Sequence, residues 1–363
     1  MIPSILWLIE RLARHHDVQV VVPFQEPTPG SWPLLGATVH NVVARFWRVQ
    51  AVQTLLHLHL VRPLDVVHAI WARKSGEVAL WGGRMCGCPV VVHVMGGELV
   101  WMPDVPFGTK RPWHRALVRH VIRRADQVTA ASSPMVAAIR AVGVDATHVR
   151  LGVDLSVWRP THPRPHPAGE PFRVVHVGSV TPVKDQATLV RAAAVLTRDG
   201  VDVRVDLVGE DTEHGSIQRL AAELGVSDRV TVHGFLTQEQ AIPVVRAADV
   251  MAVTSRHEAG PIAMLEAAAV GVPTVGTPVG HVAEWAPAAA VAFPHGDAAA
   301  LARAILELAA DDDRRIALAR RAQTAALAHD ADWTAARFEA IYEDVVDRRA
   351  RRLGRPSAGP DPA

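Results

Sequence analysis

Residues 159–171 read RPTHPRPHPAGEP, and five prolines fall within these thirteen positions. Proline has no backbone N–H and stiffens the chain, so the segment is typical of an extended linker. On both sides of it, short runs rich in valine alternate with longer segments rich in alanine, leucine and arginine, which is the pattern of repeated βα units. We therefore predict that residues 157–171 join two separately folded α/β domains.

The β-branched runs are apolar along their whole length, as expected for parallel strands that helices cover on both faces. Examples are PVVVHV at residues 89–94 and RVVHV at residues 173–177. The sequence thus predicts two Rossmann-like domains with parallel sheets and a ligand cleft between them, since open α/β sheets bind ligands beyond the carboxyl ends of their strands. The expected parts are residues 1–156, the linker 157–171, residues 172–330, a C-terminal helix over 331–352 and a disordered tail over 353–363.

Composition narrows the classes of function. The 363 residues carry a formal net charge of +1, which argues against a dedicated nucleic-acid-binding protein. Residues 1–155 contain 16 Lys and Arg against 10 Asp and Glu, and Arg45-Phe46-Trp47-Arg48 begins a predicted helix, which favours weak peripheral contact with an anionic membrane. A helix that faces the core gives the same pattern. No apolar run reaches transmembrane length, so we expect a cytoplasmic protein with reduced cysteines.

A glycine and a proline open the most informative helix, in the stretch Glu258-Ala-Gly-Pro-Ile-Ala-Met-Leu-Glu266. Gly260 lets the backbone approach a ligand closely, and Pro261 is favoured at the first position of a helix. The free N–H groups from Ile262 onward and the helix dipole form an anion site suited to a diphosphate. Glu266 lies roughly 7–8 Å further along the axis, about the offset from a diphosphate to its ribose diol. Glu258 would lie at the opposite end, near a sugar.

A second motif opens the C-terminal domain, where a strand ends at Gly178-Ser179 and a loop delivers Lys184 to the start of the next helix. A cation there would stabilise the charge that builds on a departing nucleotide diphosphate. Gly209 and Phe235 follow two further strands on the same edge of the sheet, and Phe235 could bound a base pocket. The alternative interpretation of Phe235 is a core residue. The alternative interpretation of Glu258 and Glu266 is a pair of solvated surface residues.

Together these residues resemble the family 4 glycosyltransferases, and the resemblance extends over almost the whole chain. The family's E-x7-E motif matches Glu258 to Glu266, and its strand-glycine-x5-lysine segment matches Gly178 to Lys184. The stretch His93-Val-Met-Gly-Gly-Glu is similar to the family's N-terminal segment, in which a histidine lies near the donor sugar.

The resemblance implies a GT-B fold, a C-terminal helix that returns to the N-terminal domain, and sugar transfer with retention of configuration and without a metal or other cofactor. It implies that Lys184 binds the diphosphate, Glu266 the ribose and Glu258 the sugar hydroxyls, with His93 reaching across the cleft as a further catalytic residue. The donor would be a UDP- or GDP-linked sugar, whereas the acceptor, a glycan, lipid or small molecule, is left open. A buried histidine at a strand end is the alternative interpretation of His93.

Two features depart from the family pattern. Ser179 occupies the position of a usual arginine, so Lys184 alone or another arginine would neutralise the diphosphate. The family usually begins with a β-strand and a glycine-rich loop, whereas this sequence starts within the next helix, so we expect a further strand upstream of Met1; a truly incomplete acceptor-side wall is the other interpretation. A catalytically silent nucleotide-sugar-binding protein therefore stays an alternative, and the E-x7-E motif disfavours a nucleotide-sugar epimerase. The only Asp-x-Asp patterns, Asp311-Asp-Asp313 and Asp330-Ala-Asp332, lie at or next to the starts of predicted helices, and no metal-binding cluster is predicted.

Overall fold

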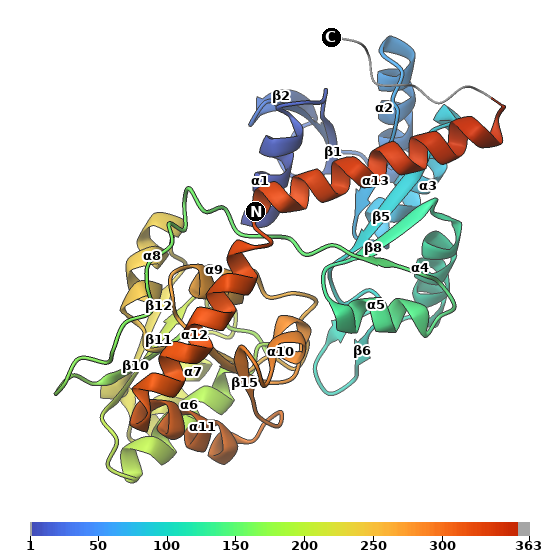
Figure 1. Ribbon diagram of the computed structural model, residues 1–363. Helices are drawn as coiled ribbons and strands as arrows, with labels where there is room; N and C mark the ends of the chain where they lie inside the picture. The colour runs from blue at the N-terminus through green and yellow to red at the C-terminus, as the bar shows by residue number, and fades with distance from the viewer. Residues whose placement is uncertain (1, 355–363) are drawn as a thin grey trace. The chain divides into compact units, whose positions relative to one another are not determined.

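The computed structural model describes residues 2–354, which fall into two compact units (Figure 1). The first unit contains residues 2–102, 107–151 and 331–354, and the second contains residues 103–106 and 152–330. Most of the tail predicted over 353–363 lies outside the described residues.

The first unit is built on two main sheets. A three-stranded sheet contains, in order, β1 (Gln19–Pro23), β3 (Ala37–Val42) and β2 (Gly30–Leu34), of which β2 is antiparallel. A parallel sheet contains, in order, β4 (Val67–Ile70), β5 (Val90–Val94), β8 (Gln127–Ala130) and β9 (Thr147–His148). A short hairpin pairs β6 (Trp101–Met102) with β7 (Phe107–Gly108). Within residues 2–354 no strand joins β1 to β4, and the strand expected upstream of Met1 stays a prediction.

The C-terminal helix α13 (Ala331–Arg352) belongs to this first unit and packs against α1 (Pro3–Leu12), as Figure 1 shows. Arg11 Nε lies 2.7 Å from Asp332 Oδ1, which links the two helices by an ion pair. Phe338 of α13 is fully buried. The prediction that the last helix returns to the N-terminal domain is therefore confirmed. The remaining helices are α2 (Trp47–Val61), α3 (Lys74–Cys86), α4 (Pro112–Arg124) and α5 (Ser133–Arg140).

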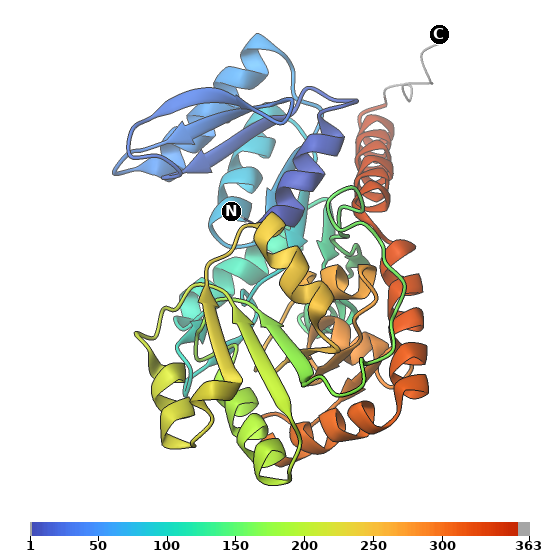
Figure 2. The ribbon, with the colours of Figure 1, turned by 90° about the vertical axis from the view of Figure 1, so that its left-hand side faces the viewer.

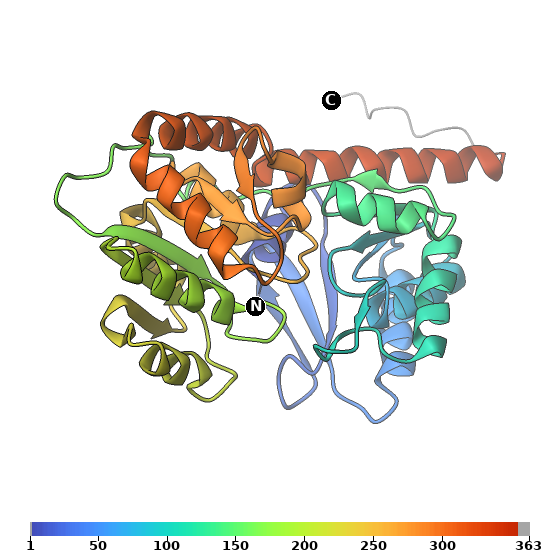
Figure 3. The same ribbon diagram turned by 90° about the horizontal axis from the view of Figure 1, so that it is seen from below.

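The second unit is a six-stranded parallel sheet between two layers of helices (Figures 2 and 3). In sheet order the strands are β12 (Val230–Gly234), β11 (Val203–Val208), β10 (Phe172–Val177), β13 (Val250–Val253), β14 (Thr274–Gly276) and β15 (Ala290–Ala292). The helices are α6 (Gln186–Arg198), α7 (Ser216–Glu223), α8 (Gln238–Ala247), α9 (Ile262–Ala269), α10 (Gly280–Trp285), α11 (Ala298–Ala310), α12 (Asp312–Leu327) and the 3₁₀ turn η1 (Ser227–Arg229). Helix α6 packs against α7 and α11, whereas α9 packs against α12. Val174 and Val175 point to opposite faces of β10 and are both fully buried, which explains the unbroken apolar run.

The strand order of the second unit reverses at β10. This strand pairs with β11 on one side and β13 on the other, because the chain first moves outward to β12 and then returns. At such a switch point the loops after the two central strands diverge and leave room for a ligand. The segments concerned are residues 178–185, after β10, and residues 254–261, after β13.

Candidate functional site

Lys184 and Glu258 meet at the switch point of the second unit. Lys184 Nζ lies 2.5 Å from Glu258 Oε1, and Ser255 Oγ donates a hydrogen bond of 2.6 Å to the same oxygen. Burial alone would raise the pKa of Glu258, but the Lys184 ammonium and the two hydrogen bonds hold that pKa below its ordinary value. The site therefore pairs an ionised Glu258 carboxylate with Lys184, from loops 74 residues apart in the sequence.

The loop after β10 is in close backbone contact with Gly209, which directly follows β11. Gly209 has φ +149°, and a Cβ there would lie 2.3 Å from the carbonyl oxygen of Gly178. Gly280 lies near the second loop, where a Cβ would come within 2.8 Å of Pro261 Cδ and 3.2 Å of Glu258 Cβ. The 2.3 Å and 2.8 Å distances are shorter than real Cβ contacts, so larger residues at Gly209 and Gly280 would push the loops apart. Sequence reasoning identified Gly209 but not Gly280, although Gly280 also follows a predicted strand.

Helix α9 begins at Ile262, with Pro261 as its N-cap residue, one position later than predicted. Gly260 precedes the cap, so the N–H groups of Ile262 and Ala263, which donate no backbone hydrogen bond within residues 2–354, lie directly after the Glu258 loop. The next N–H, that of Met264, donates to the Pro261 carbonyl at 3.1 Å.

Glu266, in the second turn of α9, is 8% exposed. Burial raises the pKa of Glu266 to about 7, and an interaction with the Trp158 side chain opposes the shift in part. Both glutamates of the motif are largely buried, and the solvated-surface interpretation is wrong.

Phe235 directly follows β12 and is 76% exposed. The core alternative for this phenylalanine is therefore wrong, whereas its contact with a nucleotide base stays a prediction. Ser179 supplies no charge. Arg256, in the second loop, donates its backbone N–H to the carbonyl of Val183 at 2.7 Å, and its guanidinium is paired with Asp104.

His93 lies within β5 of the first unit and is fully buried. Its Nδ1 is 2.8 Å from Thr129 Oγ1, and its ring packs against Phe338 of α13 at a centroid distance of 5.4 Å. Burial, followed by the nearby imidazole of His68, lowers the pKa of His93 to about 3. In this position no atom of His93 is accessible to a ligand, which favours the interpretation as a buried histidine. Its catalytic role stays a prediction.

The loop after β5 contains a residue that sequence reasoning did not single out. The Glu98 carboxylate is 6% exposed and accepts hydrogen bonds from the backbone N–H groups of Ala72, at 3.2 Å, and Gly96, at 2.8 Å. Burial raises the pKa of Glu98, and these backbone donors oppose the shift. Glu98 thereby ties the loop after β5 to the loop after β4. An acidic residue directly after two glycines at a strand end was the available signal.

The described residues show neither a metal-binding cluster nor a membrane-spanning helix. Residues 2–354 contain no cluster of three or more His, Cys, Asp or Glu side chains arranged to bind a metal ion. No helix within the same residues is long and apolar enough to cross a membrane. The predicted independence of metals and other cofactors stays a prediction.

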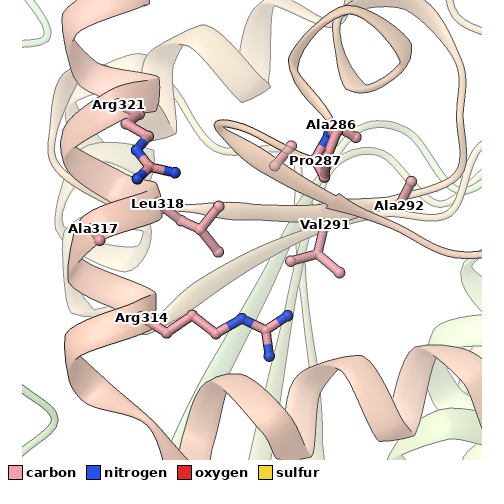
Figure 4. A pocket seen from close by; sticks show the side chains of 9 residues that line it. Ala286, Pro287, Val291, Ala292, Arg314, Ala317, Leu318 and Arg321 are labelled. Carbon is pink, nitrogen blue, oxygen red and sulfur yellow. The ribbon is translucent and has the colours of Figure 1, made fainter.

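A cavity of about 480 Å³ in the second unit shares no residue with the Lys184–Glu258 pair (Figure 4). It lies between β15 and α12, and Arg314 and Arg321 line one side of it. Arg314 is paired with Glu307 at 3.0 Å, and Arg321 donates to the carbonyl of Ala288 at 3.2 Å. Both guanidinium groups already have protein partners, so the cavity gives no independent indication of a ligand.

Solved structures with the same architecture define the class of fold. The Anabaena protein HepE, in complex with UDP and glucose, superposes with a TM-score of 0.76 at 18% identity, over 94% of this chain and 96% of that one. Sucrose-phosphate synthase from Thermosynechococcus elongatus gives a TM-score of 0.79 at 21% identity, over 93% and 91% of the two chains. The protein therefore has the GT-B fold, as the sequence predicted.

Sequence relatives identify the family within this fold. Residues 1–151 match the model of the glycosyl transferase 4-like domain, and residues 159–325 match that of glycosyl transferases group 1. D-inositol 3-phosphate glycosyltransferase 1 of Catenulispora acidiphila is 30% identical over 313 residues, which are 78% of this chain and 73% of that protein. The chain belongs to the family 4 glycosyltransferases.

Other relatives match over shorter stretches. The D-inositol 3-phosphate glycosyltransferase of Nocardia farcinica is 34% identical over 179 residues, 45% of this chain and 40% of the relative. The enzyme of the same name from Mycolicibacterium smegmatis is 40% identical over 147 residues, 38% of this chain and 32% of the relative. The matched region thus spans less than half of the length of these two proteins.

Proposed function

We propose that this protein transfers a sugar from a nucleotide-diphosphate sugar to an acceptor hydroxyl, with retention of configuration at the anomeric carbon. The observation that carries the proposal is the 2.5 Å pair of Lys184 Nζ and Glu258 Oε1 at the switch point, directly before the start of α9. A cation, a carboxylate and the two free N–H groups of Ile262 and Ala263 suit a sugar linked to a diphosphate. The UDP and glucose named for the Anabaena protein support this class of donor.

Each group has a role in this proposal. The N–H groups at the start of α9 and the Lys184 ammonium bind the diphosphate, and Glu258 accepts hydrogen bonds from sugar hydroxyls. Glu266 accepts hydrogen bonds from the ribose. Gly178, Ser179, Gly209, Gly260, Pro261 and Ile262 supply close backbone contacts, and Phe235 bounds the base. UDP and GDP are the two nucleotides we propose.

The transfer step breaks the bond between the anomeric carbon and the diphosphate oxygen and forms a bond from the same face to the acceptor oxygen. The hydroxyl proton goes to the departing phosphate, so no protein base is required. Charge grows on the diphosphate as the bond breaks, and Lys184 with the α9 amides stabilises that charge. We propose that no metal ion takes part, because this ammonium and these amides provide the electrostatic stabilisation.

A phosphorylated polyol is the acceptor class that we propose, because several relatives are named D-inositol 3-phosphate glycosyltransferase. The excess of basic residues in residues 1–155 supports an anionic acceptor. In the first unit, Arg48, Arg73 and Arg111 lie close enough to His114 to lower its pKa, after the larger effect of desolvation.

Weak peripheral contact with an anionic membrane remains a second proposal about partners. Phe46 is 71% exposed and Leu60 is 83% exposed, at opposite ends of α2. Arg45 precedes the exposed Phe46, and an arginine beside an aromatic residue suits the headgroup region of a bilayer.

The proposed function is tested by incubating the purified protein with UDP- and GDP-linked sugars, with and without D-inositol 3-phosphate. We expect sugar transfer from one donor, an anomeric configuration equal to that of the donor by NMR, and activity unchanged by EDTA. Donor binding without transfer or hydrolysis would favour the silent binding protein that Ser179 suggests. Inverted product, or activity lost in EDTA and restored by magnesium or manganese, would contradict the proposed mechanism.

A further inference from the structure

Two polar side chains are buried directly behind the Lys184 loop. His176 lies near the end of β10 and is 2% exposed, and Gln186, at the start of α6, is 1% exposed. Burying an imidazole and an amide costs free energy unless hydrogen bonds replace those lost to water. Neither residue belongs to the family motifs matched above, so their contacts require an explanation of their own.

The contacts of His176 fix which of its ring nitrogens carries the proton. Nδ1 lies 3.0 Å from the carbonyl oxygen of Ala252, which can only accept, so Nδ1 must donate. Burial, and then the charge of Lys184, lowers the pKa of His176 to about 4, so the ring is neutral at pH 7. Nε2 is therefore a bare acceptor, and it faces Gln186 Nε2 at 3.2 Å.

This acceptor sets the orientation of the Gln186 amide. One N–H donates to His176, and Gln186 Nε2 also lies 3.0 Å from the carbonyl oxygen of Ser179 and 3.4 Å from that of Gly178. The same orientation leaves Gln186 Oε1 buried without a hydrogen-bond partner among the described residues. Leaving a buried acceptor unpaired is unfavourable, which shows how strongly the donors at Nε2 determine the arrangement.

The amide in turn holds the two peptide groups that flank Ser179. Its 3.0 Å contact is with the Ser179 carbonyl, which belongs to the next peptide along the chain, and its longer 3.4 Å contact is with the Gly178 carbonyl. In a trans peptide the N–H points opposite to the C=O, so the Ser179 N–H, across its peptide from Gly178 O, is directed away from Gln186. Gly209 packs over this peptide, since a Cβ there would lie 2.3 Å from Gly178 O and 2.7 Å from Ser179 N. A Cβ on Gly178 would lie 3.4 Å from Lys184 Cε, so the lysine side chain passes beside the same peptide. Within residues 2–354 the Ser179 N–H donates no backbone hydrogen bond.

We propose that His176 and Gln186 are positioning residues that direct the Ser179 N–H toward the diphosphate of the donor. A fixed N–H beside Lys184 then contributes part of the stabilisation expected of the arginine that the family pattern has at this position. The inference rests on the proposed function, because it assumes a diphosphate ligand. The backbone N–H of Ser179 would thus compensate in part for the missing arginine side chain. His176 and Gln186 would hold that N–H in place without contacting the ligand themselves.

The test compares nucleoside diphosphates with their monophosphates by calorimetry, using UDP against UMP and GDP against GMP. Gln186→Leu removes both N–H donors at similar volume. We expect the variant to bind the preferred diphosphate about five- to tenfold more weakly and the monophosphate within twofold of wild type, since only the diphosphate reaches the Ser179 loop. His176→Phe, which leaves Gln186 able to bind Ser179, should weaken diphosphate binding about two- to threefold.

Gln323→Leu is the matched control. Gln323 Nε2 also donates to two carbonyls of the second unit, those of Thr161 and Ala269, both at 2.8 Å, and it contacts neither loop of the site. This variant should bind both classes of nucleotide as wild type does. Thermal unfolding checks that each variant folds, and Gln186→Met replaces Gln186→Leu if the branched side chain prevents folding.

Equal affinity of the Gln186 variant and wild type for the diphosphate would overturn the inference, and so would an equal loss for diphosphate and monophosphate. Wild-type protein that binds no nucleotide at all would overturn the proposed function and the inference with it. Diphosphate binding by wild type with an unaffected Gln186 variant would leave the proposed function standing and remove only the inference.

Discussion

The catalytic residues predicted in the two units differ in their position relative to the strand ends. In the second unit, Lys184 and Glu258 lie beyond the ends of β10 and β13 and are 27% and 12% exposed. In the first unit, the predicted catalytic His93 lies within β5 and is fully buried against α13. A side chain beyond a strand can turn toward a ligand, whereas one inside a covered strand meets the helix above it. For Lys184, Glu258 and His93, position relative to the strand end thus separates the side chains that can reach a ligand from the one that cannot.

Removal of the Lys184 ammonium should have the largest effect on turnover. It tests whether the residues beyond the strand ends of the second unit carry the chemistry. We expect Lys184→Ala to lower kcat about 10²–10³-fold with a smaller change in KM, because charge grows on the diphosphate in the transition state. Lys184→Arg should recover only part, since a guanidinium presents its donors in a planar fork. Steady-state kinetics of donor turnover measure both, and normal turnover by the alanine variant would favour a silent binding protein.

Glu266 should show opposite effects on binding and stability. Glu266→Gln should weaken donor binding by at least tenfold, because an amide is a weaker and less complete acceptor for the ribose diol. The same variant should unfold less readily than wild type at pH 8, because it removes a buried carboxylate with no ion pair among the described residues. Calorimetry with the donor and chemical denaturation without it measure the two quantities. Unchanged donor affinity would reject the ribose assignment.

The pH dependence of stability provides a separate test of Glu266. Burial raises its pKa from 4.5 to about 7 in the folded protein, so the folded state binds more protons than the unfolded state between these values. The contribution of Glu266 to the free energy of unfolding should therefore fall as pH rises through this window, by about 3 kcal/mol in all, and level off above it. Denaturant titrations from pH 4.5 to 8 measure the free energy of unfolding of wild type and of Glu266→Gln. The difference between the two proteins should fall across this range, and a difference that does not change with pH would contradict the prediction.

Substitution of His93 tests whether a histidine buried within a strand takes part in catalysis. We expect His93→Leu to change turnover less than about tenfold, because the imidazole is fully buried against Thr129 and Phe338. Loss of the 2.8 Å contact with Thr129 should lower the free energy of unfolding by about 1–2 kcal/mol. Kinetics at saturating donor, with denaturation as the control for folding, distinguish the roles. A turnover loss above 10²-fold in a stable variant would restore the catalytic prediction.

Binding to membranes should be the smallest effect. We expect slightly more protein to sediment with vesicles containing phosphatidylglycerol than with neutral vesicles, and Phe46→Ser to remove the difference, since Phe46 is 71% exposed. Equal sedimentation of wild-type protein with both vesicles would reject contact through this part of α2.

Much of the fold could be predicted because the apolar runs of the strands and the proline-rich linker are local features of the sequence. The hairpin of β2 and β3 was missed because its turn, Leu35-Gly36 with φ of +51° and +83°, lacks the usual asparagine or aspartate. Pro33 within β2 also argued against a strand, although proline is tolerated in a strand that is antiparallel and at an edge.

The individual residues of the candidate site could be predicted from the sequence, but the direct contact between Lys184 and Glu258 could not. Lys184 and Glu258 were assigned to different parts of one ligand, and their direct pairing follows only from the strand order around β10. The surroundings of His93 could not be predicted, since the run Val90–Val94 is buried on both faces and gives no periodicity that reveals which side faces α13. His176 and Gln186 gave no signal because their roles depend on hydrogen bonds to backbone groups.

The Lys184–Glu258 pair has a consequence for how the reaction ends. Under the proposed function, a bound donor would supply phosphate oxygens to the lysine and sugar hydroxyls to the glutamate, so both charges would exchange one partner for another. After transfer the nucleotide diphosphate would still attract Lys184, but nothing would replace the hydroxyls at Glu258, whose side chain is only 12% exposed. The pair would then re-form and compete with the spent nucleotide for the ammonium. Such competition favours dissociation of the product over the donor, and it would appear as tighter binding of UDP-glucose than of UDP by wild type, with the difference reduced in Glu258→Gln.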